Sequence, residues 1–114
     1  MIAFHRTALW RGLVSAVAGV VLVAPAAAQS DAPVERGRTL VETHCARCHA
    51  AGKTGASPHE KAPPFRTLNR RYPVEQLAES LAEGIVTGHA DMPQFAFPPA
   101  DVGAIIAYLK SIAE

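Results

Sequence analysis

The chain has 114 residues, which is room for a single domain. Hydrophobic residues make up 49% of it and charged residues 18%, a composition typical of a folded globular protein rather than a disordered one. The formal net charge of +1 gives no basic excess that would indicate nucleic-acid binding. Two cysteines cannot form the multi-disulfide framework that stabilises many small secreted domains.

Residues 1–28 are predicted to form a secretory signal peptide. Arg6 and Arg11 provide the positive start, and an uncharged, largely apolar stretch follows at 12–23. The alanines at 26–28 are the small residues that precede a cleavage site. We therefore expect export to the periplasm.

Removal of this leader leaves residues 29–114 as the single domain, and the loss of two arginines makes its net charge slightly negative. The alternative is an uncleaved membrane anchor, because the apolar run at 12–28 is near the lower length limit for spanning a bilayer. Pro25 and the alanines favour cleavage, after which we expect no membrane span.

The first helix is expected from Pro33 to Cys45, with Asp31 as its cap and a proline in its first turn. Gly37 lies inside it. A glycine at such a position costs about 1 kcal/mol relative to alanine, so a packing reason for it is expected.

The second helix is expected over 74–83, because Leu77, Leu81 and Ile85 recur at four-residue spacing. Gly84 or Gly88 would end it. The third helix is expected to begin near Pro99, with Asp101 in its first turn and an apolar face along the rest of its length, formed by Val102, Ile105, Ile106 and Leu109.

The connections at 50–65 and 87–98 are rich in glycine and proline, and no segment alternates like a strand. The fold class is therefore predicted to be all-α with long loops. Long loops in a small domain usually carry function.

The sequence Cys45-Ala46-Arg47-Cys48-His49 has the C-x-x-C-H pattern by which c-type haem is attached. Two thiols three residues apart can each form a thioether with one vinyl group of the same porphyrin. His49 is then placed to coordinate the iron. We therefore predict one haem c, covalently attached through Cys45 and Cys48.

Other chemistries fit the motif less well. A thioredoxin-like redox pair needs a strand–helix setting that the sequence lacks. A zinc site needs four ligands, and His44, His49, His59 and His89 are not spaced as a second ligand pair. A disulfide across such a short loop would constrain little.

Met92 is the predicted second axial ligand. It is the only methionine outside the leader, and it lies in a turn-rich Met-Pro loop. The rival ligand is His89, three residues earlier. The second ring nitrogen of His49 needs a hydrogen-bond acceptor, for which the carbonyl of Pro63 or Pro64 is the candidate. Three arginines after these prolines are candidates either for pairing with haem propionates or for a solvated basic face, namely Arg66, Arg70 and Arg71.

The order of these motifs resembles the class I cytochromes c over nearly all of the chain after the leader. The motif at 45–49 is followed by Ala62-Pro63-Pro64-Phe65, by Met92-Pro93 and by a helix carrying Ala107-Tyr108-Leu109. The resemblance implies a small helical fold whose first and last helices cross, with the haem behind them. It implies close approach of Gly37 to the Tyr108 region, and it favours Pro63 for the bond to His49.

The function expected is that of a periplasmic one-electron carrier between two redox proteins, not an enzyme. We expect a monomer that meets its donor and acceptor transiently. The alternatives are a dedicated electron-transfer subunit of a periplasmic dehydrogenase or oxidase, and a haem-based gas sensor or peroxidase. The last requires that Met92 does not bind the iron or leaves it readily.

Overall fold

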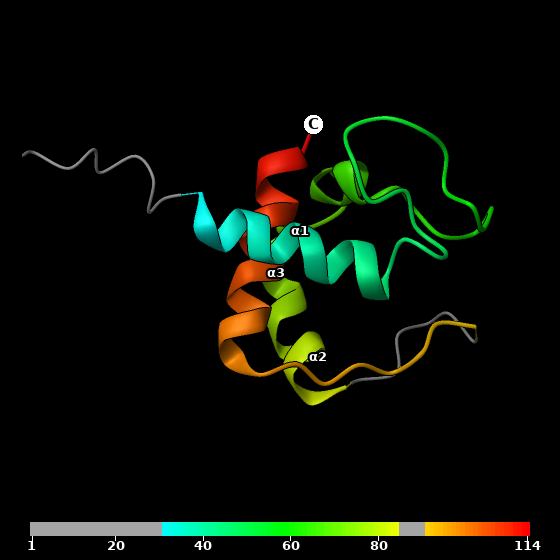
Figure 1. Ribbon diagram of the computed structural model, residues 1–114. Coiled ribbons are helices and arrows are strands. Elements are labelled where there is room, and N and C mark those ends of the chain that lie inside the picture. The colour runs from blue at the N-terminus through cyan, green and yellow to red at the C-terminus, as the bar shows by residue number, and fades with distance from the viewer. Residues whose placement is uncertain (1–30, 85–90) are drawn as a thin grey trace, which may run out of the picture.

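A computed structural model describes residues 31–84 and 91–114 (Figure 1). The predicted leader lies outside the described residues, as do Ile85, Gly88 and His89. The described part is helical and has no strand, which confirms the all-α prediction. Its elements in chain order are the helix α1 (Ala32–His44), the 3₁₀ helices η2 (Phe65–Arg70) and η3 (Val74–Gln76), and the helices α2 (Leu77–Glu83) and α3 (Pro99–Ile112).

The start of α1 corrects one expectation. Asp31 occupies the N-cap position, but its side chain makes no capping hydrogen bond. Its backbone is already helical (φ −91°, ψ −19°), whereas a capping side chain normally belongs to an extended residue. The following Pro33 has no backbone N–H to be capped. The Asp31 carbonyl still accepts a hydrogen bond from the Glu35 N–H at 2.9 Å.

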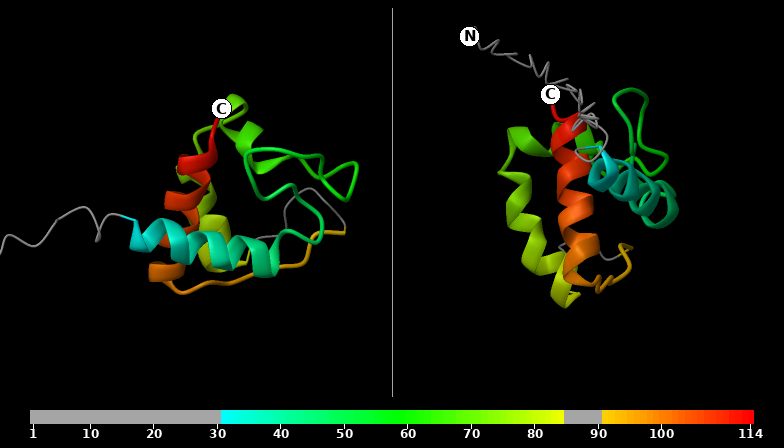
Figure 2. Two further views of the ribbon diagram at one scale, coloured as in Figure 1. Left: turned by 45° about the horizontal axis from the view of Figure 1, so that its top comes forward. Right: turned by 60° about the vertical axis from the view of Figure 1, so that its left-hand side comes forward.

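Helices α1 and α3 cross (Figures 1 and 2), and Gly37 lies at the contact between them. A Cβ atom built on Gly37 would overlap the carbonyl oxygen of Ala104 and lie 2.8 Å from the Cβ of Tyr108. The glycine therefore lets two helix backbones approach more closely than any side chain would allow. This contact supplies the packing reason that the sequence required, and it confirms the predicted approach of Gly37 to Tyr108.

Helix α2 lies beside α3 and ends at Gly84, whose left-handed backbone (φ 74°) closes the helix (Figure 2). The predicted second helix is thus confirmed, with its first turn formed as the 3₁₀ helix η3. The 3₁₀ helix η2 was not predicted. The core that these elements enclose consists of Val41, Phe65, Leu68, Val74, Ile105, Tyr108, Leu109 and Ile112.

Ion pairs tie α3 to the elements around it. Asp101, in the first turn of α3, accepts a hydrogen bond of 2.6 Å from the Arg36 Nε of α1. Near the other end, Lys110 lies 2.7 Å from Glu75 of η3, and this bond lowers the pKa of the glutamate. Within residues 31–84 and 91–114, no helix has the length and apolar character needed to cross a membrane.

Candidate functional site

The motif of residues 45–49 continues the course of α1 by one more turn. Cys45 is the C-cap, and its N–H donates to the carbonyl of Val41 at 2.9 Å. The N–H groups of Cys48 and His49 then both donate to the Cys45 carbonyl, at 3.1 and 3.0 Å. This tight turn brings both thiols and the imidazole to the lining of one cavity. The two cysteines are not joined in a disulfide.

His49 is buried, and the oxygen of Pro63 lies 2.8 Å from its Nδ1. A carbonyl can only accept, so Nδ1 carries the proton and donates it to Pro63. In the predicted haem site, the coordinating nitrogen would then be Nε2. The residues alone leave Pro63 and Pro64 as alternative acceptors for His49, and the resemblance favours Pro63. The structure explains why Pro63 is the acceptor, because the N–H and the hydroxyl of Thr67 both donate to the Pro64 carbonyl.

A cavity of about 260 Å³ opens beside the motif, and a second of about 130 Å³ adjoins it. The second is lined mainly by apolar residues from α2, α3 and η2. The residues that line both cavities are Cys45, His49, Met92, Pro93 and Phe95. The site therefore combines two thiols, an imidazole and a thioether with an apolar interior.

Met92 reaches this lining from the loop at 91–98, which is packed between α1 and α2. The N–H of Phe97 donates to the Leu81 carbonyl at 2.8 Å. Phe95 and Phe97 both contact the imidazole of His44 edge to face, with ring centroids 5.8 and 5.4 Å away. The rival ligand His89 lies outside the described residues.

Burial controls the chemistry of the first thiol. Desolvation, and secondly the neighbouring Cys48, raise the pKa of Cys45 from 9.0 to about 11. Cys45 therefore stays a neutral thiol at physiological pH, with little of the thiolate that reacts with oxidants and alkylating agents.

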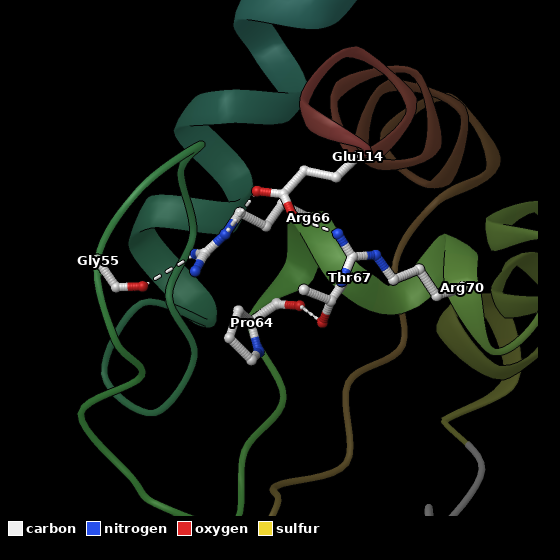
Figure 3. Close-up of polar contacts among 6 residues, drawn as sticks. All are labelled: Gly55, Pro64, Arg66, Thr67, Arg70 and Glu114. Carbon is white, nitrogen blue, oxygen red and sulfur yellow. Dashed lines mark hydrogen bonds and ion pairs between the residues drawn. The ribbon is translucent and has the colours of Figure 1, made fainter.

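The arginines after the proline stretch do not face the cavities. Arg66 and Arg70 reach Glu114 at 3.0 and 2.9 Å, and Arg66 also donates to the Gly55 carbonyl at 2.9 Å (Figure 3). Neither they nor Arg71 are among the described residues that line either cavity. The two cations that do line the larger cavity are Arg47 and Lys61, which sequence reasoning did not single out.

Sequence reasoning also missed how the backbone after His49 is held. The Ala50 N–H donates to the hydroxyl of Ser57 at 3.0 Å, and the Tyr108 hydroxyl donates to the Ala51 carbonyl at 2.9 Å. Isolated serine and tyrosine residues carry no pattern that would reveal such bonds in advance. Both depend on segments that are brought together only by the fold.

The donor set fits the haem c that the motif predicts. Thiols at the required spacing, a histidine of fixed tautomer and a methionine meet at one cavity, which adjoins a mainly apolar one. The described residues include no group of three or more His, Cys, Asp or Glu side chains that could hold a metal ion by themselves.

Comparison with known proteins supports the same interpretation. The family model described as cytochrome c matches residues 34–113, which run from within α1 past the end of α3 and include every predicted site residue. No curated protein and no solved structure shows a significant match to the chain.

Proposed function

The chain belongs to the cytochrome c family, and we propose that it is a periplasmic carrier of single electrons between two redox proteins. The family is one of haem-based electron carriers. Membership of the family therefore accounts for electron transfer by a haem in general. The proposal adds the location, the partners and the roles of individual residues.

The observation that carries the proposal is the meeting of Cys45, Cys48, His49 and Met92 at one cavity. In the proposal the two thiols hold the haem by thioether bonds, and His49 and Met92 are its axial ligands. When bound, the haem iron supplies a couple that gains and loses one electron. Ligation by His and Met raises the reduction potential of such a couple.

Filling both axial positions favours electron transfer over catalysis. A peroxidase or gas sensor needs an open position on the metal for its substrate. The loop that carries Met92 is bonded to α2 through Phe97 and packed on α1 through His44, which supports a ligand that stays in place.

The proposed partners are a donor and an acceptor that dock briefly over a small area, as redox partners do. We propose that the protein works as a monomer, freed from residues 1–28 after export. The near balance of its charges predicts a weaker dependence of docking on ionic strength than in strongly basic carriers.

The test is the absorption spectrum of the purified protein, produced together with a cytochrome c maturation system. We expect a reduced spectrum typical of haem c and a pyridine haemochrome with one haem per chain. Addition of carbon monoxide to the reduced protein at neutral pH should leave the spectrum unchanged. A colourless protein would refute the proposal, and ready binding of carbon monoxide would favour the sensor or peroxidase.

Two further measurements address location and assembly. The amino-terminal sequence of the protein from the periplasm should begin after Ala28. Gel filtration of the native extract should show the small carrier alone, whereas elution with a larger enzyme would favour the dedicated subunit.

A further inference from the structure

We propose that Phe65 is a positioning residue that sets the plane of the His49 imidazole, and thereby the orientation in which this ligand meets the haem iron. The inference rests on the proposed function, because it takes His49 as an axial ligand. It adds a second determinant of the ligand's geometry to the hydrogen bond that His49 donates to the Pro63 carbonyl.

The rings of His49 and Phe65 are stacked. Their centroids are 4.4 Å apart and their planes differ by 22°. Each residue is 8% exposed, so the stacked pair is almost entirely removed from solvent. Offset stacking of this kind contributes beyond the burial of the two rings, and it favours one relative orientation over others.

The hydrogen bond to Pro63 and the stack with Phe65 restrict different motions. The bond from Nδ1 to the Pro63 carbonyl fixes one direction within the imidazole plane. Because a hydrogen bond tolerates a departure from ideal alignment, it still leaves the ring some freedom to turn about its Cβ–Cγ bond. The face of Phe65 opposes this rotation, because tilting the imidazole would break the near-parallel contact. The two contacts together narrow the range of planes that the ring can take.

Phe65 is itself held by the segment that carries His49. Its N–H donates to the carbonyl of Ala50 at 3.1 Å, and Ala50 directly follows the histidine. Phe65 also begins η2 and belongs to the buried core. Phe65 is therefore held both by the backbone next to the motif and by the core, and its ring has little freedom to move away from the imidazole.

The orientation of an axial imidazole has a spectroscopic signature. In low-spin ferric haem, the plane of the ligand determines how the unpaired electron is distributed over the porphyrin. The g-values in electron paramagnetic resonance and the spread of the haem methyl shifts in proton NMR both report this distribution. A contribution of Phe65 to stability alone would not change either quantity.

The test compares three variants of the haem-loaded protein. Phe65→Leu keeps an apolar side chain but removes the stacked ring, and it should shift the g-values and alter the spread of the haem methyl resonances. Phe65→Tyr keeps the ring and should retain the wild-type values. Val74→Ala removes buried volume from a residue that lines neither cavity. It should lower the thermal midpoint and leave the spectra unchanged.

Wild-type spectra of the Phe65→Leu protein would overturn the proposal. A measurement on the reduced wild-type protein tests it without any variant, in case Phe65→Leu is not recovered with haem. Nuclear Overhauser contacts should connect the ring protons of Phe65 and His49, and their absence would also overturn it. Failure of the proposed function is read separately, from the absence of covalent haem or from carbon monoxide binding to the reduced protein.

Discussion

The thiol of Cys45 is largely removed from water beside Cys48, and this decides its chemistry. Burial beside Cys48 raises the pKa of Cys45 to about 11. A neutral thiol resists oxidation, because the thiolate is the reactive form. The protection comes from the fold, since the same thiol in an unfolded chain has an ordinary pKa.

Alkylation of the haem-free protein should report this shift. The thiolate is the reactive form, and a pKa raised by two units lowers its fraction at neutral pH by about 100-fold. Under native conditions, the iodoacetamide reaction of Cys45 should accelerate up to about pH 11, whereas in urea it should level off near pH 9. Trypsin cleavage after Arg47 separates the two cysteines for mass spectrometry. Equal rates with and without urea would contradict the assigned burial.

Replacement of Met92 tests the proposed second ligand. Met92→His should lower the midpoint potential, because imidazole stabilises the ferric state more than a thioether does. It should also abolish the sulfur-to-iron charge-transfer band at the red end of the oxidised spectrum. An unchanged band would exclude Met92 as the ligand and would favour the rival ligand His89.

At the scale of the elements, the crossing of α1 and α3 is the central contact of the fold. At Gly37 the backbones are so close that the Ala104 carbonyl and Tyr108 occupy the space that a side chain would need. Tyr108 then bonds with the Ala51 carbonyl just beyond the motif. The crossing therefore connects the helix packing to the segment that positions His49.

Gly37→Ala should destabilise the haem-loaded protein by about 2 kcal/mol, because overpacking outweighs the better helix propensity of alanine. Gly103→Ala is the matched control on α3. Gly103 is exposed, and a Cβ built on it meets nothing within 4 Å, so this change should stabilise by about 0.5–1 kcal/mol. Thermal unfolding of both variants is the measurement. A neutral effect of Gly37→Ala would mean that the helices do not cross at this residue.

At the scale of the whole molecule, charged groups join segments that are distant in sequence. Glu114 accepts from Arg66 and Arg70, its N–H donates to the Arg66 carbonyl, and Arg66 holds the carbonyl of Gly55 (Figure 3). These bonds join three segments at one place: the loop at 50–63, the helix η2 and the end of α3.

Glu114→Gln should cost less than about 1 kcal/mol, because the ion pairs are partly exposed, and the loss should shrink in high salt. Arg66→Ala should cost more, since this side chain is 18% exposed and also bonds with Gly55. Thermal unfolding in low and high salt separates the two effects. A loss for Glu114→Gln that does not change with salt would show that charge is not the cause.

The sequence by itself determined the features that depend on local pattern. The periodicity of apolar residues predicts the helices, and the spacing of Cys45, Cys48 and His49 indicates the haem because thioether attachment requires neighbouring residues. Local pattern misled at Asp31, which occupies the N-cap position but whose side chain makes no capping hydrogen bond. It also left the role of Arg66 open between two alternatives.

Only the tertiary structure decided which distant groups meet. The stacking of Phe65 on His49, the bond from Tyr108 to Ala51 and the engagement of Arg66 with Glu114 each join residues that no sequence period relates. The physical reason is that such contacts depend on where whole helices lie. Their placement follows from the packing of α1 against α3, in which a single missing side chain at Gly37 sets the distance between the two helices.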